Sequence, residues 1–152
     1  MRSSSLLPPV LVACLLAAGG ASAQEGGSLT VAFRDIKTPK GAILAAVFDR
    51  EAAYNGQGAP VRTIALPVTG GRAETVLKGL PPGRYAISAF HDVDGDGKMK
   101  TNPFGIPLEP FAFSNGAEAN MGRPSWDAAA FEVTAGAGAQ TLSIDSSLGA
   151  AQ

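Results

Sequence analysis

The sequence contains little of the chemistry on which metalloproteins and many enzymes depend. Its 152 residues include one cysteine and one histidine, Cys14 and His91. A single chain therefore cannot build a metal site from clustered Cys or His ligands, and a Ser-His-Asp triad would have to use His91. Charged residues make up only 16% of the chain, and 12 Lys and Arg against 13 Asp and Glu leave no basic excess to attract nucleic acid.

Glycine and proline, in contrast, are abundant, with 19 and 11 residues. Both residue types interrupt helices, so this composition disfavours a helical bundle or a coiled coil. Hydrophobic residues make up 45% of the chain, which is enough for a core at this length. The composition thus indicates one β-rich domain.

The first 23 residues have the features of a secretory signal peptide. Arg2 gives a positive start, residues 6–16 form a short apolar stretch, and residues 21–23 (ASA) supply the small side chains of a cleavage site. The apolar stretch is too short for a membrane-spanning helix, which needs about 20 residues. We therefore expect cleavage after Ala23 and a mature protein that starts at Gln24, exported to the periplasm or the extracellular space.

Cys14 leaves a second localisation open. Residues 11–14 (LVAC) resemble the lipobox of bacterial lipoproteins, in which the cysteine is acylated and becomes the first residue. Residues 15–18 continue the apolar stretch, whereas a lipoprotein usually turns polar or small there. Cleavage after Ala23 is the favoured prediction, and a lipid-anchored envelope protein is the alternative.

Short stretches in which apolar and polar residues alternate follow one another along the mature chain. Such alternation is typical of half-buried strands. The stretch 42–48 (AILAAVF) is apolar throughout and predicts a central strand covered on both faces. The expected strands are residues 29–34, 42–48, 61–68, 72–77, 84–91, 130–134 and 140–145.

This pattern predicts an all-β domain over residues 28–145. We expect a single antiparallel β-sandwich, immunoglobulin-like or transthyretin-like, with about seven strands, Greek-key connections and one long central loop. A small barrel is the alternative. Residues 136–139 predict a hairpin turn between the last two strands, residues 24–27 a short linker, and residues 146–152 a flexible tail. The apolar phase of the strands predicts a core that includes Val31, Phe33, Val47, Ile87, Phe131 and Leu142.

The segment 91–98 (HDVDGDGK) contains the densest polar signal. Asp92, Asp94 and Asp96 occupy positions 1, 3 and 5 of the Asp-x-Asp-x-Asp-Gly calcium loop, and a glycine follows at position 6. A hard cation needs several oxygens, and the backbone carbonyl of Lys98 at position 7 would add one. Three neighbouring carboxylates also repel one another in the absence of a cation. These residues predict a weak Ca²⁺ site, the only cofactor that we expect.

The second half of the calcium motif does not match. Position 9 is Lys100 and position 12 is Pro103, where the motif has oxygen ligands. Side-chain oxygens of Asn102, Glu109 or Asp127 would have to complete the coordination shell. The alternative is an ordinary polar turn between strands, because Asp-Gly occurs twice and is a preferred turn dipeptide.

Several motifs in and after this segment resemble a bacterial family known as domain of unknown function 2141. The marks of the family are a His-Asp loop rich in Asp and Gly, then Gly-Ile-Pro-x-Glu and aromatic-x-Phe-Ser-Asn. The matching segments here are residues 91–98, 105–109, 111–115, 122–126 and 130–131. The resemblance covers residues 28–145 and implies an exported β-sandwich protein of unassigned biochemical role, usually with an acidic residue where Lys100 stands. Residues 80–85 (LPPGRY) are similar, more weakly, to transthyretin-like and carboxypeptidase-regulatory modules, which concerns the fold alone.

We therefore expect a secreted or periplasmic, non-enzymatic β-sandwich module that binds an extracytoplasmic protein or a glycan. We expect a monomer that neither spans a membrane nor binds nucleic acid. The acidic loop and the segment after it would form the functional face. The residues assigned to this face are His91, Asn102, Gly105, Pro107, Glu109, Phe111, Phe113, Asn115 and Trp126.

The alternative is a small carbohydrate-acting hydrolase that uses His91, Asp92 and Glu109. Asp92 and Glu109 would then be the pair of carboxyl groups that glycoside hydrolysis needs. This function requires the three side chains to converge in an open pocket, and it fails if Glu109 points into its own loop. A single histidine without a nucleophile nearby is more typical of a structural residue that hydrogen-bonds the following loop.

Overall fold

The structure is a computed structural model, and it describes residues 26–145. The strands of this part are β1 (Gly27–Arg34), β2 (Ala42–Phe48), β3 (Arg62–Pro67), β4 (Ala73–Leu80), β5 (Gly83–Asp92), β6 (Phe111–Phe113), β7 (Phe131–Val133) and β8 (Ala137–Ser143). Its helices are α1 (Glu51–Tyr54), α2 (Trp126–Ala129) and the single 3-10 turn η1 (Ser114–Gly116). No helix among these residues is both long and apolar enough to cross a membrane. The predicted signal peptide, the alternative anchor at Cys14 and the predicted tail at 146–152 lie outside the described residues.

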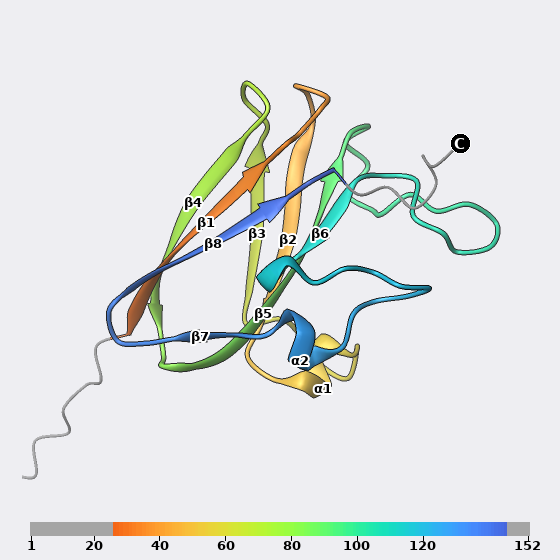
Figure 1. The fold of residues 1–152 in the computed structure, drawn as a ribbon. Coiled ribbons are helices and arrows are strands. Elements are labelled where there is room, and N and C mark those ends of the chain that lie inside the picture. Colours follow the sequence, from red (N-terminus) through yellow and green to blue (C-terminus); the bar gives the residue numbers. More distant parts are fainter. Residues whose placement is uncertain (1–25, 146–152) are drawn as a thin grey trace, which may run out of the picture.

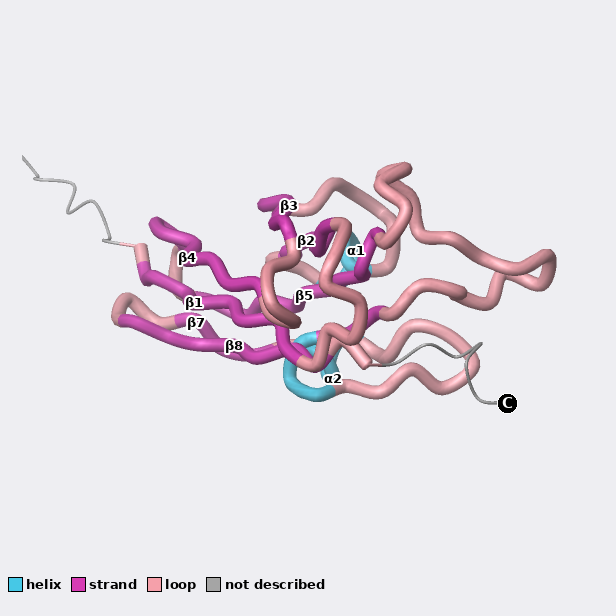
Figure 2. The backbone as a smooth tube through the Cα atoms, turned by 90° about the horizontal axis from the view of Figure 1, so that it is seen from above, coloured by secondary structure: helices cyan, strands magenta, loops and turns pink. Residues whose placement is uncertain are grey.

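The strands form two sheets (Figure 1). One sheet has the order β4-β1-β8, and the other has the order β3-β2-β5-β6, with β7 paired to the first residues of β5. Figure 2 shows the strands from above, with the loops that follow β5 and β6 extending past them on one side. The prediction of an all-β sandwich is confirmed, and β1 begins one residue inside the predicted linker.

Three details of the predicted topology are wrong. First, β8 pairs with β1 in parallel, so the sandwich is not antiparallel throughout. Second, residues 136–139 do not form a hairpin turn, because β7 pairs with β5 whereas β8 pairs with β1 in the other sheet. Third, β6 lies within the segment predicted as a long loop, since a strand of three residues is too short to produce a periodic pattern.

The main core lies between the two sheets and consists of the inward-facing residues of the strands. Five of the predicted core residues are buried, and these are Val31, Phe33, Val47, Ile87 and Leu142. The prediction is wrong for Phe131, which is only partly buried against this core. The reason is that β7 pairs with β5 only over residues 83–85, at the end of the sheet, where its first side chain packs at the rim of the core.

The two short helices cover one end of the outer face of the five-stranded sheet, where a second apolar cluster forms (Figure 1). The ring of Tyr54 in α1 lies 5.6 Å from the ring of Phe48 and 5.8 Å from that of Trp126, edge to face in both cases. Ser125 caps α2, since its side chain accepts the Ala128 N–H at 3.3 Å. The rest of this outer face is bordered by loops, and it is there that the candidate site lies.

The two phenylalanines test the assignment of the core. Replacing Phe33, which is fully buried, by alanine should destabilise the protein by about 3–5 kcal/mol. The same change at the partly buried Phe131 should cost clearly less, because fewer contacts are lost. Urea denaturation of the two variants gives both free energies of unfolding, and equal losses would show that the strand phase is misassigned.

Candidate functional site

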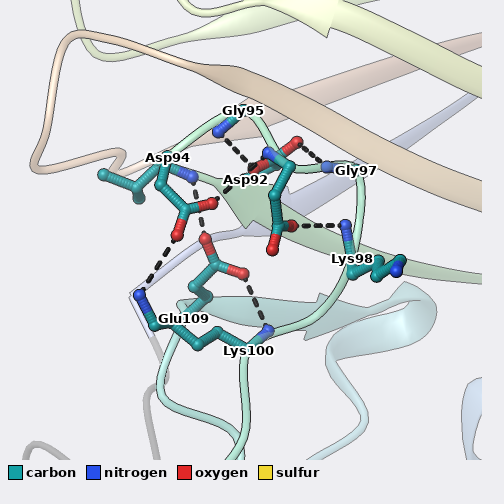
Figure 3. Close-up of polar contacts among 9 residues, drawn as sticks. Asp92, Asp94, Gly95, Gly97, Lys98, Lys100 and Glu109 are labelled. Carbon is teal, nitrogen blue, oxygen red and sulfur yellow. Dashed lines mark hydrogen bonds and ion pairs between the residues drawn. The ribbon is translucent and has the colours of Figure 1, made fainter.

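Three aspartates gather where β5 runs into the following loop (Figure 3). Ligand oxygens of Asp92, Asp94 and Asp96 all lie within 4.8 Å of one another, in keeping with the calcium-loop spacing. Asp92 is buried and accepts the Gly95 N–H at 2.7 Å and the Gly97 N–H at 3.0 Å. Its carboxylate therefore stabilises the turn that brings the three side chains together.

Lys100 supplies a counter-charge to this cluster. Its Nζ lies 3.1 Å from Oδ2 of Asp94, and this hydrogen bond lowers the pKa of Asp94 and raises the pKa of Lys100. Because the pKa of Asp94 is depressed in the folded state, the pair stabilises the protein above the ordinary pKa of an aspartate, and this contribution is lost as the pH falls through the depressed value. Position 9 of the loop thus holds an ammonium group where the calcium motif has an oxygen ligand.

Two of the other candidate side-chain ligands have partners elsewhere. Asp127 pairs with Arg84 at 2.9 Å, and the side chain of Asn102 is used within its own turn. Lys98, whose carbonyl is the predicted ligand at position 7, lies within the loop itself, where its backbone N–H donates to Oδ1 of Asp96 at 2.8 Å. Within residues 26–145, the acidic cluster that could hold a cation therefore consists of the three aspartates alone.

Glu109 holds the two ends of the acidic loop together (Figure 3). Its Oε1 accepts the Val93 N–H at 2.9 Å, and its Oε2 accepts the Lys100 N–H at 3.0 Å. The residue is only 5% exposed. A buried carboxylate must be compensated by hydrogen bonds, and these two backbone donors provide them. We call residues 93–100, closed by Glu109, the clasped loop.

Residues 100–108 form a narrow projection beyond the clasped loop, which we call the arm. The Asn102 N–H donates to the Ile106 carbonyl at 2.9 Å, and the Asn102 side chain accepts the N–H groups of Phe104 and Ile106. The chain reverses at Gly105, whose φ of 78° lies in the left-handed region that favours glycine. The Gly-Ile-Pro-x-Glu motif thus builds the returning half of the arm and ends on the glutamate that closes the loop.

His91 has a structural position. It is 1% exposed, and its Nε2 lies 2.6 Å from the Lys40 carbonyl in the loop before β2. The prediction named the wrong loop: β2 pairs with β5, with Ile43 opposite His91, so the segment that precedes β2 is the nearer one. His91 therefore fixes the loop before β2 against the end of β5.

The outer face of the five-stranded sheet holds an apolar groove with a volume of about 1100 Å³. Its floor consists of two rows of side chains that the strand register aligns across β3, β2, β5 and β6. The first row is Ala65, Leu44, Phe90 and Phe111. The second row is Thr63, Ala46, Ser88 and Phe113. A third row, formed by Phe48 and Ala86, belongs to the cluster beneath α1 and α2 and ends the floor on that side.

Two loops form the walls of this groove. The clasped loop and the arm contribute Met99, Phe104 and Ile106, and the segment between η1 and α2 contributes Met121 and Arg123. Both segments extend past the strands on the same side (Figures 1 and 2). Phe104 is 89% exposed and Met121 is 100% exposed. Large apolar side chains left in water around an apolar groove are typical of a ligand site.

The structure divides the predicted functional face into three groups. Four of its residues line the groove, namely Gly105, Pro107, Phe111 and Phe113. Three are buried or half-buried and hold loops in place, namely His91, Asn102 and Glu109. Two lie at α2, namely Asn115 and Trp126.

The Phe-Ser-Asn motif anchors α2 to the sheet. The buried hydroxyl of Ser114 accepts the Ile87 N–H at 2.8 Å and donates to the Ala129 carbonyl at 2.6 Å. Asn115 has a φ of 59°, and its Nδ2 donates to the Ala128 carbonyl at 3.0 Å. These contacts hold α2 against β5. The end of the groove that α2 covers is fixed in the same way.

Sequence reasoning missed the floor of the groove. The prediction that residues 42–48 are covered on both faces is wrong for the outer face, where Ala42, Leu44 and Ala46 are only partly buried. The sequence did contain a signal for the groove. Residues 42–48 are apolar on both faces, and the chain has no helix long enough to cover the outer face among residues 26–145. Phe90, Phe111 and Phe113 gave a similar signal on the neighbouring strands.

The fold and these motifs together define a β-sandwich with a clasped acidic loop. The family described as "Uncharacterized protein conserved in bacteria (DUF2141)" matches residues 31–141, and the chain belongs to this family. The family membership expected from the sequence motifs is therefore confirmed. Comparisons with curated proteins and with solved structures found no match.

The clasp can be tested at Glu109. Glu109→Gln should destabilise the protein by about 1–3 kcal/mol, because an amide nitrogen replaces one carboxylate oxygen and leaves one backbone N–H without its acceptor. The matched control is Glu118→Gln at an exposed glutamate, which should change stability by less than about 0.5 kcal/mol. Urea denaturation measures both, and equal stabilities of the two variants would contradict the clasp.

The Ca²⁺ site stays a prediction, and Lys100 is the residue with which to test it. With a dissociation constant on the order of 10⁻⁴ M, millimolar Ca²⁺ would stabilise the protein by about 1.4 kcal/mol and raise Tm by roughly 3–8 °C. Lys100→Asp provides an oxygen at position 9 and should enlarge the Ca²⁺-dependent shift relative to the wild type.

Lys98→Asp is the control, because it makes the same charge change at a position that offers only its backbone carbonyl. Thermal melts with Ca²⁺ and with a chelator give the shifts. A wild type and variants that show no response to Ca²⁺ would show that the loop is an ordinary Asp-Gly turn. An equal response of the two variants would contradict the role of position 9.

Proposed function

We propose that this protein is an exported, non-enzymatic binding module that holds an apolar ligand in the groove of its five-stranded sheet. The observation that carries the proposal is the floor of the groove. Apart from the buried Phe111, its two aligned rows of side chains have no covering element among residues 26–145. Apolar surface left in water is unfavourable by about 25 cal/mol per Å². A ligand that covers these rows would therefore gain free energy from burial on both sides.

The lining of the groove supports an apolar ligand over a glycan. Its polar side chains are three hydroxyls, of Thr63, Ser88 and Thr101, and the guanidinium of Arg123. A glycan carries several hydroxyls per sugar ring, and each needs a partner when it is buried. Small-molecule sites are mostly apolar with a few placed polar groups, which describes this lining well.

The same lining supports binding rather than catalysis. His91, Asp92 and Glu109, the residues of the hydrolase alternative, do not line the groove, and Glu109 points into its own loop. The charged side chain in the lining is Arg123, and a guanidinium offers hydrogen-bond donors but no acceptor for a proton. The hydrolase alternative therefore has no support in these contacts.

The exported location rests on the sequence of the first 23 residues. We propose that the signal peptide is removed after Ala23, with a lipid anchor at Cys14 as the alternative. The intact mass of the protein exported by a bacterial host separates a chain that starts at Gln24 from one that starts at an acylated Cys14.

Binding in the groove can be tested with N-phenyl-1-naphthylamine, a neutral apolar dye whose fluorescence rises in apolar sites. The wild type should bind the dye, and Ala46→Trp should weaken binding by roughly tenfold, about 1.4 kcal/mol, because the indole fills the second row of the floor. Val76→Trp is the control, since Val76 is exposed on β4 in the other sheet. Both variants should keep a cooperative thermal melt. No binding by the wild type, or equal affinities of the two variants, would contradict the proposal.

A further inference from the structure

We infer that the ligand of the groove is a single-chain amphiphile with an anionic head group, whose carboxylate pairs with Arg123 while its hydrocarbon chain lies on the floor. This inference rests on the proposed function and adds the chemical class of the ligand. It is carried by the position and the partners of one cation and by a floor that is apolar apart from the hydroxyls of Thr63 and Ser88.

Arg123 is the one charged side chain in the lining of the groove. Its guanidinium donates to the Tyr54 carbonyl and lies 4.8 Å from the centre of the Tyr54 ring and 5.9 Å from that of Phe48. These contacts hold the cation at the end of the floor that α1 closes. An anionic group of a ligand is therefore attracted to that end of the groove.

The guanidinium of Arg123 has hydrogen-bond donors that the contacts described above do not use. It carries five N–H groups in a planar fork that matches a carboxylate, and one of them is used on the Tyr54 carbonyl. No ion pair among the described residues includes Arg123, since the pairs found there use Arg50, Arg84 and Lys100. The cation lies beside an apolar surface without an anionic partner from residues 26–145, so a ligand carboxylate would complete its contacts.

The floor of the groove favours a hydrocarbon chain over a peptide. It is the face of a sheet, so the backbone N–H and C=O groups of its central strands β2 and β5 are already paired with neighbouring strands in the plane of the sheet. A peptide laid across this face would bury one N–H and one C=O for each residue with few partners, which is unfavourable. A hydrocarbon chain has no such groups, and the aromatic rings of Phe90, Phe111 and Phe113 would contact it along the floor.

The exposed apolar residues of the two walls fit the same ligand. Phe104 at the turn of the arm and Met121 in the segment before α2 line the groove, although water surrounds most of their surface. A chain that fills the groove would cover part of this apolar surface. The polar end of the amphiphile would meanwhile lie at Arg123, in the same segment as Met121.

The experiment compares two amphiphiles with nearly the same chain and opposite charge, dodecanoate and dodecyltrimethylammonium. Each is titrated, below its micellar concentration, against the bound N-phenyl-1-naphthylamine, and the readout is the ratio of the two affinities. The wild type should prefer dodecanoate on the order of tenfold at low salt, because the cation attracts one head group and repels the other. The preference should shrink as ionic strength rises.

Arg123→Gln should bring this ratio close to one, and Arg123→Lys should restore most of it. The control is Arg62→Gln, which removes an exposed cation of β3 that does not line the groove and should leave the ratio unchanged. A wild type that binds the dye but shows no preference between the amphiphiles would overturn the inference and leave the proposed function standing. A preference that survives in Arg123→Gln would overturn the role of Arg123. A wild type that does not bind the dye would overturn the proposed function itself.

Discussion

The acidic loop and the wall of the groove depend on one buried carboxylate. Glu109 accepts the N–H groups of Val93 and Lys100 and thereby closes the loop between them. These two hydrogen bonds offset part of the conformational entropy that the loop loses when it becomes ordered. The closure fixes the point at which the arm leaves the sheet. Lys100 takes part twice, since its backbone N–H satisfies Glu109 and its ammonium group pairs with Asp94. The acidic loop, the clasp and the wall of the groove are therefore one connected unit.

The outer face of the five-stranded sheet is packed against helices at one end and holds the groove at the other. At one end, Tyr54 and Trp126 from the two helices pack on the third row of side chains, and Ser114 ties α2 to β5. At the other end, the first two rows remain available to a ligand. Arg123 lies at the boundary, where it lines the groove while its guanidinium lies on the ring of Tyr54. The packing of the closed end thus positions the cation that we assign to ligand recognition.

Sequence periodicity was sufficient for most of the strands, because alternation directly reflects which side chains face the core. It could not reveal the parallel pairing of β1 with β8, since pairing partners leave no local pattern. The acidic loop was found from its spacing, but Lys100, which interrupts the calcium motif, is an ion-pair partner of Asp94 in the folded loop. The groove was missed because its floor joins single residues from four strands, such as Thr63, Ala46 and Ser88, which only the register brings into one row.

The most direct test of this account is an NMR titration of the ¹⁵N-labelled protein with dodecanoate below its micellar concentration. If the groove holds the ligand, the largest amide shifts should map to the second row of the floor, at Ala46, Ser88 and Phe113, and to the segment that carries Arg123. The strands β1 and β4 of the other sheet should change little. Shifts confined to the acidic loop, or centred on the three-stranded sheet, would contradict the assignment of the groove as the binding site.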